Sequence, residues 1–230
     1  MKVTYIQHSG FAVEFEECVL IFDYYKGTLP RFEQDKKIYV FASHSHYDHF
    51  QKSIFEWEKK YSQIRYILSD DIHADNAANR IFMGPNEECD VDNIRIKTLR
   101  STDEGVAFFV SVRNAETSET KYIYHAGDLN WWHWEEEGDI YNRIMELNYQ
   151  RALALIEGVH VDVAFVPVDP RLGDAYYWGL DWFMNHTDTD RVYPMHLWGK
   201  YEILDRLMCQ PETEEYREKI MRLSEDDECR

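Results

Sequence analysis

The segment at residues 43–49, with the sequence SHSHYDH, concentrates side chains that bind metal ions. Three histidines and one aspartate fall within six residues of it, directly after the apolar run at residues 38–41. Imidazole and carboxylate are the ligands that a borderline divalent ion such as zinc prefers. A turn after a buried strand can aim such neighbours at one point, which a regular helix or strand does not do. The segment therefore predicts a metal site, and the alternative is a polar loop that is rich in histidine by chance.

Acidic or imidazole side chains also follow other apolar runs of the chain. They are Asp23 after residues 19–22, Asp128 after residues 121–124, Asp169 after residues 161–166 and His196 after residues 191–195. Taken singly, each is most simply an ordinary polar residue of a loop. Because strand ends on one edge of a sandwich can bring distant residues to one site, the set as a whole favours a metal centre.

The elements that would position these residues begin with short strands in quick succession. We predict strands at residues 3–6, 11–15, 19–22 and 38–41, with a hairpin turn at His8-Ser9-Gly10. A doubly wound sheet would instead alternate strand and helix from the start. Further strands are predicted at residues 66–68, 94–99, 106–112, 121–124, 161–166 and 191–195, and helices at 54–61, 70–79, 139–156 and 177–185. We expect one domain over residues 1–230, with an acidic helical C-terminal segment at about residues 201–223.

Composition and charge limit the classes of function. The 230 residues are 44% hydrophobic and 15% aromatic, which suffices for a folded core. The formal net charge of −18 argues against nucleic acid and anionic membranes as partners. Four cysteines without a Cys-x-x-Cys spacing indicate free thiols in a reducing compartment, and no run is long and apolar enough for a signal region or a membrane span. We expect a soluble cytoplasmic protein with a small-molecule substrate; the sequence does not determine its oligomeric state.

The motif HSHYDH at residues 44–49, the Gly-Asp pair at residues 127–128 and the lone His196 after a strand resemble the metallo-β-lactamase superfamily. The resemblance extends along the strand order from residue 3 to about residue 209. It implies a fold of the mixed α/β class, the four-layer αββα sandwich. The opening HSGF at residues 8–11 and the absence of long insertions resemble the compact cytoplasmic hydrolases akin to the ascorbate-6-phosphate lactonases.

The resemblance also implies a role for each ligand. In the family, the first two histidines of the motif and a later third histidine hold one metal, and His44 and His46 take the first two places. Asp48, His49 and His196 correspond to the ligands of a second metal. The aspartate of the Gly-Asp pair, which bridges both metals, corresponds to Asp128.

The chain departs from this pattern at the third histidine of the first metal. That histidine is expected after the strand at residues 94–99, where the chain reads RSTDEG, with Ser101 at the expected place. Asp103 could complete the first site, with Glu104 as another carboxylate in reach, and an oxygen-rich site would suit manganese or iron as well as zinc. Alternatively, water completes the site, or the protein is mononuclear. His125 and His133 are further substitutes, although each is more simply a supporting or surface residue.

We therefore expect one or two divalent ions per chain, with zinc as the first choice and manganese or iron as alternatives. A bound ion lowers the pKa of its water and polarises a carbonyl or phosphoryl oxygen. Asp48 and Asp128 are the catalytic candidates, and Asp48 could also orient the nucleophile and move its proton. The residues that we place beside the ligands, as supports or substrate contacts, are Asp23, His8, Ser101, Trp131, Asp169 and Arg171.

Several of these supporting residues have a second interpretation. Asp23 either accepts from an imidazole N–H or caps a turn. Trp131 begins the run Trp-Trp-His-Trp, which forms an aromatic wall for the substrate or packs in the core. Arg171 binds an anionic substrate group or pairs with Asp169, and we favour the ion pair.

The predicted function is hydrolysis of a small-molecule ester, lactone or phosphoester. One alternative is a metal-binding protein without turnover, which the missing histidine favours. A nuclease is disfavoured by the net charge of −18. A redox variant with two irons stays open because of Asp103, although no flavin-binding domain accompanies it. A β-lactamase proper is disfavoured because no secretion signal is present.

Overall fold

The computed structural model describes residues 1–227, and its first six strands form one mixed sheet. The order in this sheet is β1-β2-β3-β4-β5-β6. β1 to β3 pair antiparallel, and β3 to β6 pair parallel. The strands are β1 (Lys2–Gln7), β2 (Gly10–Glu14), β3 (Cys18–Phe22), β4 (Lys37–Ala42), β5 (Ile64–Ser69) and β6 (Arg80–Met83).

The second six-stranded sheet has the order β14-β12-β10-β9-β8-β7. β10, β12 and β14 pair parallel, whereas β7 to β10 pair antiparallel. The strands are β7 (Glu88–Val91), β8 (Ile94–Arg100), β9 (Val106–Arg113), β10 (Thr120–His125), β12 (Val163–Pro167) and β14 (Val192–Met195). The short strands β11 (His160–Val161) and β13 (Asp188–Thr189) form a separate pair.

Both faces of the first sheet are buried. β3 is therefore apolar at every position, because each of its residues faces a core. Its alternate residues Leu20 and Phe22 belong to the core between the sheets. The intervening Val19 and Ile21 face a second core, which includes Ile54 of the 3-10 helix η1 (Lys52–Lys59). η1 and its neighbouring loops therefore form the outer layer on this sheet, where an α-helix was predicted.

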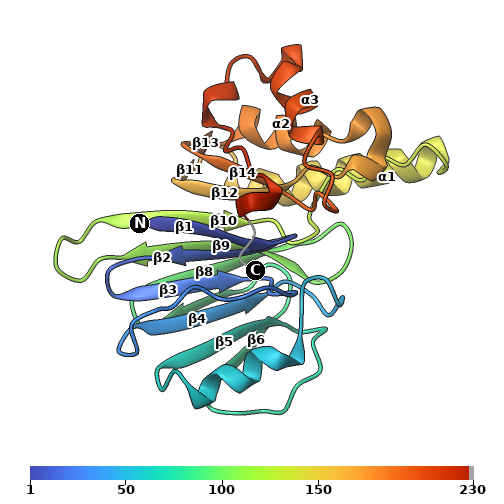
Figure 1. The fold of residues 1–230 in the computed structure, drawn as a ribbon. Helices are drawn as coiled ribbons and strands as arrows, with labels where there is room; N and C mark the ends of the chain where they lie inside the picture. The colour runs from blue at the N-terminus through green and yellow to red at the C-terminus, as the bar shows by residue number, and fades with distance from the viewer. Residues whose placement is uncertain (228–230) are drawn as a thin grey trace.

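Helices cover the outer face of the second sheet. In Figure 1, α1 (Asp139–Leu153), α2 (Trp178–His186) and α3 (Ile203–Cys209) gather beside β12 and β14, and η1 lies at the opposite side, beside β5 and β6. The ring of Tyr124 on β10 stacks on Phe183 of α2, with centroids 4.9 Å apart. Helix, sheet, sheet and the η1 layer make up the four-layer sandwich, so the predicted fold class is confirmed.

Two predicted helices are wrong. Residues 70–79 form turns that lead into β6 rather than a helix. Asp and Asn side chains are frequent there and compete with helical hydrogen bonds, and Asp71 Oδ2 accepts a bond from the backbone N–H of Ser45 at 2.8 Å. Residues 211–223 contain only short 3-10 turns, and Ile220 forms an isolated β-bridge with Val192. The helical part of the predicted C-terminal segment is α3.

Parallel pairing places the carboxyl ends of β3 and β4, and those of β10, β12 and β14, at one edge of the sandwich. The loops that leave these ends carry the residues singled out above, and the β1–β2 turn reaches the same edge. At residues 1–227, no helix has the length and apolar character that crossing a bilayer requires. Cys18, Cys89 and Cys209 are free thiols, and Cys229 lies outside the described residues.

Candidate metal centre

Four buried side chains from three loops form the first donor group at this edge. They are His8 from the β1–β2 turn, Asp48 and His49 from the loop after β4, and His196 after β14, each with a ligand atom within 4.8 Å of the others. Asp48 Oδ2 lies 3.3 Å from Nε2 of His8, 3.9 Å from that of His49 and 3.8 Å from that of His196. We call this set the His8 group.

A second donor group lies beside the first and consists of His44, His46 and Asp128. Asp128 faces both groups. Its Oδ2 lies 3.6 Å from His44 Nε2, whereas its Oδ1 lies 3.2 Å from His49 Nε2 and 3.5 Å from His196 Nε2. We call the second set the His44 group. The carboxylate of Asp128 therefore stands between the groups, where the family resemblance places a bridging ligand.

Each of three imidazoles is anchored through Nδ1, which leaves Nε2 directed into the site. The anchoring pairs are His49 with Asp23 Oδ2 at 2.7 Å, His196 with Asp169 Oδ2 at 2.9 Å and His44 with Ser43 Oγ at 2.9 Å. A carboxylate can only accept, so Nδ1 of His49 and His196 carries the proton. Supports of this kind set the tautomer and orientation of metal ligands in proteins.

The donors fit a divalent cation because their inward atoms have no other partner. Among residues 1–227, the Nε2 atoms of His8, His44, His49 and His196 and Asp128 Oδ1 are buried and accept or donate no hydrogen bond. Buried polar atoms are almost always paired, so five such atoms around one space need an explanation. A cation that accepts their lone pairs supplies it.

Burial and neighbouring charges adjust the protonation of the donors. Burial raises the pKa of Asp128, but the adjacent His49 and His196 outweigh it and hold that pKa well below the usual range. Burial, together with the neighbouring His49, lowers the pKa of His44 to about 4. Burial also opposes the charge on His49, yet Asp128 and Asp23 raise its pKa well above the usual value. At neutral pH the metal-free site therefore holds an ionised Asp128, a neutral His44 and a proton on His49 that an arriving cation displaces.

The proposed substitutes for the missing histidine lie at the rim of the site. Asp103 Oδ2 is 3.9 Å from His46 Nδ1, and Glu104 Oε2 is 3.5 Å from His46 Nε2. The side chains of His46 and Asp103 are 44% and 46% exposed. Ser101 does not reach the donors and accepts a bond from the Asp103 N–H at 3.1 Å. The structure thus places Asp103 near the His44 group but outside its converging set.

The other two histidines considered as ligands lie outside both groups. His125 Nε2 donates to the carbonyl of Ser9 at 2.9 Å, and its Nδ1 accepts from the Gly127 N–H at 3.1 Å. Both ring nitrogens of His125 are therefore engaged, and the buried residue connects the end of β10 to the β1–β2 turn. His133 packs its ring on Trp178 with centroids 4.7 Å apart.

A cavity of about 200 Å³ opens beside Asp128. It is lined by Thr102, Asp103, Asp128, Trp132, Trp134, Tyr141, Met145 and Arg171. Trp132 and Trp134 stack with rings 7° from parallel, and Trp132 Nε1 donates to the Asp128 carbonyl at 3.0 Å. Trp131 instead turns away and packs on Tyr149 and Trp178. The aromatic wall is therefore present, and Trp132 and Trp134 form it rather than Trp131.

Arg171 forms an ion pair with Asp169, in agreement with the interpretation that we favoured from the sequence. Its Nε lies 3.0 and 2.9 Å from the two carboxylate oxygens, and its Nη2 lies 2.6 Å from Oδ2. The guanidinium also lies over the ring of Trp198 at 4.6 Å. Since Asp169 holds His196 as well, one buried carboxylate connects the cation at the cavity wall to a ligand of the His8 group.

Left-handed backbone is concentrated at this edge of the sandwich. His8, Asp23, His196 and Trp198 have φ of 57°, 42°, 63° and 53°. Such conformations are unfavourable for residues other than glycine and accumulate at functional sites. Gly127 shares the conformation at φ 52°, and a Cβ there would meet Ser43 Cβ at 2.6 Å, which accounts for glycine in the Gly-Asp pair.

Sequence reasoning missed two parts of this site. His8 was placed beside the ligands, whereas its Nε2 converges with them. A histidine at a two-residue hairpin turn, a position where glycine is usual, was the available signal. Ser43 links Asp23 to His44, and its place directly before the motif could have suggested that role.

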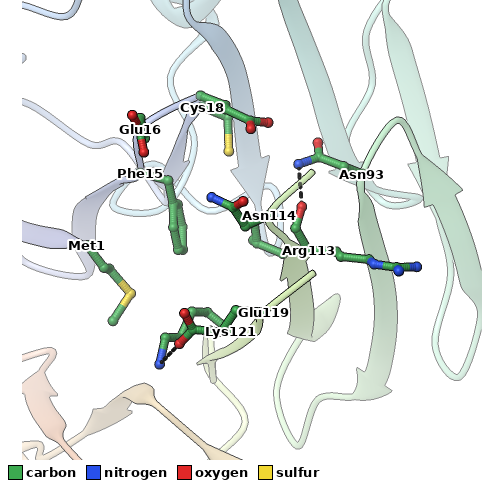
Figure 2. Close-up of a pocket in the computed structure, with 11 residues that line it drawn as sticks. Met1, Phe15, Glu16, Cys18, Asn93, Arg113, Asn114, Glu119 and Lys121 are labelled. Atoms are coloured by element: carbon green, nitrogen blue, oxygen red, sulfur yellow. Dashed lines mark hydrogen bonds and ion pairs between the residues drawn. The ribbon is translucent and has the colours of Figure 1, made fainter. Parts of the chain in front are cut away.

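Another hollow, of about 180 Å³, lies at the opposite end of the strands. Figure 2 shows Cys18 at its wall, with Phe15, Arg113 and an ion pair between Lys121 and Glu119 at 2.8 Å. Burial raises the pKa of the Cys18 thiol to about 12. None of the lining residues is a histidine that could activate the thiol, so this hollow carries no comparable chemistry.

Comparisons with known proteins agree with this geometry. The model of the family described as beta-lactamase superfamily domain matches residues 2–196, whereas no curated protein matches the sequence. Igni18, a metallo hydrolase from the archaeon Ignicoccus hospitalis, superposes with a TM-score of 0.53 at 18% identity, over 84% of this chain and 81% of its own. A candidate metal-dependent hydrolase from Parabacteroides distasonis superposes with a TM-score of 0.60 at 12% identity, over 95% and 90% of the chains.

A third similar structure is CmlA, a diiron β-hydroxylase from Streptomyces venezuelae. Its TM-score is 0.52 at 11% identity, and the match covers 86% of this chain but only 45% of CmlA. At these identities the structural similarities establish the fold, and the family match establishes descent within the superfamily. The chain therefore belongs to the beta-lactamase superfamily.

Proposed function

We propose that the protein uses a metal-activated water to cleave an ester, lactone or phosphoester of a small molecule. The observation that carries the proposal is the pair of donor groups that share Asp128 at the wall of a cavity. The His8 group and the His44 group would hold one or two divalent ions. A bound divalent ion lowers the pKa of its water towards neutrality and polarises a carbonyl or phosphoryl oxygen.

The protein's own residues orient the donors and handle the proton. Asp23, Asp169 and Ser43 keep the Nε2 atoms of three histidines turned inward. Asp48 would orient the attacking water and pass on its proton, because its carboxylate lies among the donors. Its pKa of about 2 keeps it ionised at neutral pH. Burial opposes that low pKa, and the contact with His8 outweighs it.

The cavity supports a compact substrate with an anionic group. Its volume of about 200 Å³ is below the roughly 300–1,000 Å³ of pockets for drug-sized ligands. Trp132, Trp134 and Met145 offer an apolar wall for the substrate body. Arg171 offers the cation, although its pairing with Asp169 offsets part of that charge. A small ester, lactone or phosphoester with a carboxylate or phosphate fits these walls.

Several finer features belong to the same proposal. Zinc is our first choice of metal, and the carboxylates Asp103 and Glu104 beside His46 keep manganese and iron open. We place the protein in the cytoplasm and group it with the compact hydrolases akin to ascorbate-6-phosphate lactonases. The net charge of −18 disfavours nucleic acid and anionic membrane as partners.

A second candidate function is redox chemistry at a di-iron site. The structural similarity to CmlA, a diiron β-hydroxylase, favours it. Visible absorbance of the iron-loaded protein and oxygen consumption with a reductant would support this alternative, whereas a colourless zinc protein with hydrolytic turnover would exclude it.

The test is a panel of chromogenic esters, lactones and phosphoesters, given to the metal-free and the metal-reconstituted protein. We expect turnover only after reconstitution. His46→Ala and Asp128→Ala should abolish that turnover while the chain stays folded, and His133→Ala is the matched control that removes an imidazole outside both donor groups. Retained turnover in both His46→Ala and Asp128→Ala would overturn the assignment of the site.

A further inference from the structure

His8 is a histidine where the backbone favours glycine. β1 and β2 pair Gln7 with Gly10, so the hairpin loop consists of His8 and Ser9. At φ 57°, His8 adopts the left-handed conformation that side chains beyond glycine rarely tolerate. Observed strain of this kind is a reason to ask what the side chain does.

The ring of His8 is held firmly and directed into the site. Its backbone N–H donates to the hydroxyl of Tyr5 at 2.8 Å, which braces the turn from below. The ring centroid lies 4.4 Å from that of His196 and 4.7 Å from that of Trp198. The residue is only 7% exposed, and its Nε2 is buried without a hydrogen-bond partner among the described residues.

The neighbours of this nitrogen are the donors of a metal site. Nε2 of His8 lies 3.3 Å from Asp48 Oδ2, and Nε2 of His49 and His196 lie within the same 4.8 Å set. Asp128 Oδ1 adds a fifth donor, 3.2 Å from His49 Nε2 and 3.5 Å from His196 Nε2. Three imidazoles and one carboxylate that converge, with the Asp128 carboxylate facing two of the imidazoles, suit a borderline divalent ion.

The His44 group is poorer in donors. It has two imidazoles and a share of Asp128, and one of those imidazoles, His46, is 44% exposed. The loop after β8 brings Asp103 only to 3.9 Å from His46 and does not place it in the converging set. The absent third histidine is therefore not replaced in this group.

We infer that His8 is a direct metal ligand, so that the His8 group is a closed, high-affinity site and the His44 group holds a weaker, exchangeable ion. The inference rests on the proposed metal-dependent function and deepens it. One ion is resident in the folded protein, and occupancy of the second depends on the concentration of free metal. The chain lacks the histidine expected after β8 in the His44 group, and His8 adds a histidine to the group on the other side of Asp128.

The competing explanation is that His8 only pairs with Asp48 and positions it. His8→Gly removes the imidazole at a position where glycine suits φ 57°, which offsets part of the packing lost with the buried ring. The Co²⁺ spectrum separates the two explanations, because only the loss of a coordinated imidazole removes a nitrogen donor from the bound ion. His46→Ala removes a ligand of the weaker site. His133→Ala removes an imidazole from outside both groups and serves as the matched control.

The experiment titrates each metal-free protein with Co²⁺, followed by visible absorption, and with Zn²⁺ against a chromophoric chelator. The natural chain should bind one ion tightly and a second more weakly. His8→Gly should lower the affinity for the first ion by about 10–100-fold or more and change the Co²⁺ spectrum, since even loss of a ligand's support costs this much. His46→Ala should keep the first ion and lose the second, and His133→Ala should match the natural chain.

Two results would overturn the inference, and they differ in what else they affect. A first ion in His8→Gly with the same Co²⁺ spectrum as in the natural chain, whether or not its affinity falls, would reduce His8 to a positioning residue while leaving the proposed metal-dependent function intact. Failure of the natural chain to bind either ion would remove the proposed function together with the inference. The unfolding transition of metal-free His8→Gly, measured in parallel, identifies any loss that comes from misfolding.

Discussion

Replacing Asp23 with asparagine is predicted to move the ring proton from Nδ1 to Nε2 on one histidine of each donor group, His49 and His44. Asp23 is fully buried, and its Oδ1 accepts from the Ser43 N–H at 2.8 Å. Its Oδ2 accepts from Ser43 Oγ at 2.6 Å and from His49 Nδ1 at 2.7 Å. In Asp23→Asn, the oxygen must stay opposite the Ser43 N–H, so the amide NH₂ takes the place of Oδ2.

The amide would then donate where the carboxylate accepted. His49 Nδ1 has to become an acceptor, which moves the ring proton to Nε2, the atom that faces the metal. Ser43 Oγ has to accept from the amide and donate onward to His44 Nδ1, 2.9 Å away, which moves the proton of His44 to its own Nε2. One exchange of oxygen for nitrogen thus blocks a ligand in both groups.

Lost ligand support typically lowers metal affinity by 10–100-fold, which equals about 1.4–2.7 kcal/mol. Asp23→Ala is the harsher comparison, because it strands the buried donors of Ser43 and His49. Breaking one partner of a buried ion pair costs about 3–5 kcal/mol of unfolding free energy. In a chain of this size that corresponds to a fall in Tm of roughly 6–20 °C.

The assays are urea and thermal unfolding of the metal-free proteins, Zn²⁺ titration, and ¹⁵N chemical shifts of the imidazoles. Asp23→Asn should retain most of the stability, lose metal affinity and show His44 and His49 protonated at Nε2. If Asp23→Asn binds Zn²⁺ like the natural chain with unchanged imidazole shifts, the argument for Asp23 as the support of both groups is refuted.

Three further predictions concern other residues. Asp169→Asn should lower metal affinity about 10–100-fold in the same titration, since Asp169 supports His196, and normal affinity would contradict this. In native protein at pH 8, peptide mapping after alkylation should find Cys209 modified and Cys18, whose pKa is about 12, intact. Asp188 raises the pKa of His160. The stability that the protonated His160 contributes is therefore complete below the pKa of the unfolded state and is lost as pH rises through the pKa of the folded state. NMR titration of Asp188→Asn should show a lower pKa for His160 than in the natural chain.

The strands that carry the site could be predicted because their sequences reflect burial on both faces. β3 and β4 are almost continuously apolar, and each leads directly into a residue of the site, Asp23 or the motif at residues 44–49. The motif fixed the expected edge of the sandwich, and the strand-end residues Asp128, Asp169 and His196 are found together there.

The connecting segments were less predictable because their conformation depends on contacts distant in sequence. Residues 70–79 have the alanines and acidic first turn of a helix, yet Asp71 bonds to Ser45 and the segment has to reach β6, which pairs with β5. In place of the helix predicted at residues 54–61, the chain forms the 3-10 helix η1 (Lys52–Lys59), which begins and ends two residues earlier. Local propensity carries no information on such tertiary constraints.

The position of His8 illustrates the same limit at the site. Its turn contacts His196, nearly the whole chain away in sequence, through a backbone bond of 3.4 Å from the His196 N–H to the His8 carbonyl. Only the packing of the two sheets brings these loops together. Likewise, Trp132 and Trp134 line the cavity whereas Trp131 does not, and the composition of residues 131–134 does not distinguish them.

The most direct test of the central claim measures metal content and hydrolysis on the same preparation. The protein is purified without chelator, analysed for its elements, stripped, and reconstituted with zinc, manganese or iron while turnover of the substrate panel is followed. The account predicts at least one divalent ion per chain, loss of turnover on stripping and its return on reconstitution. A protein that binds no metal after reconstitution, or whose turnover survives removal of all metal, would contradict it.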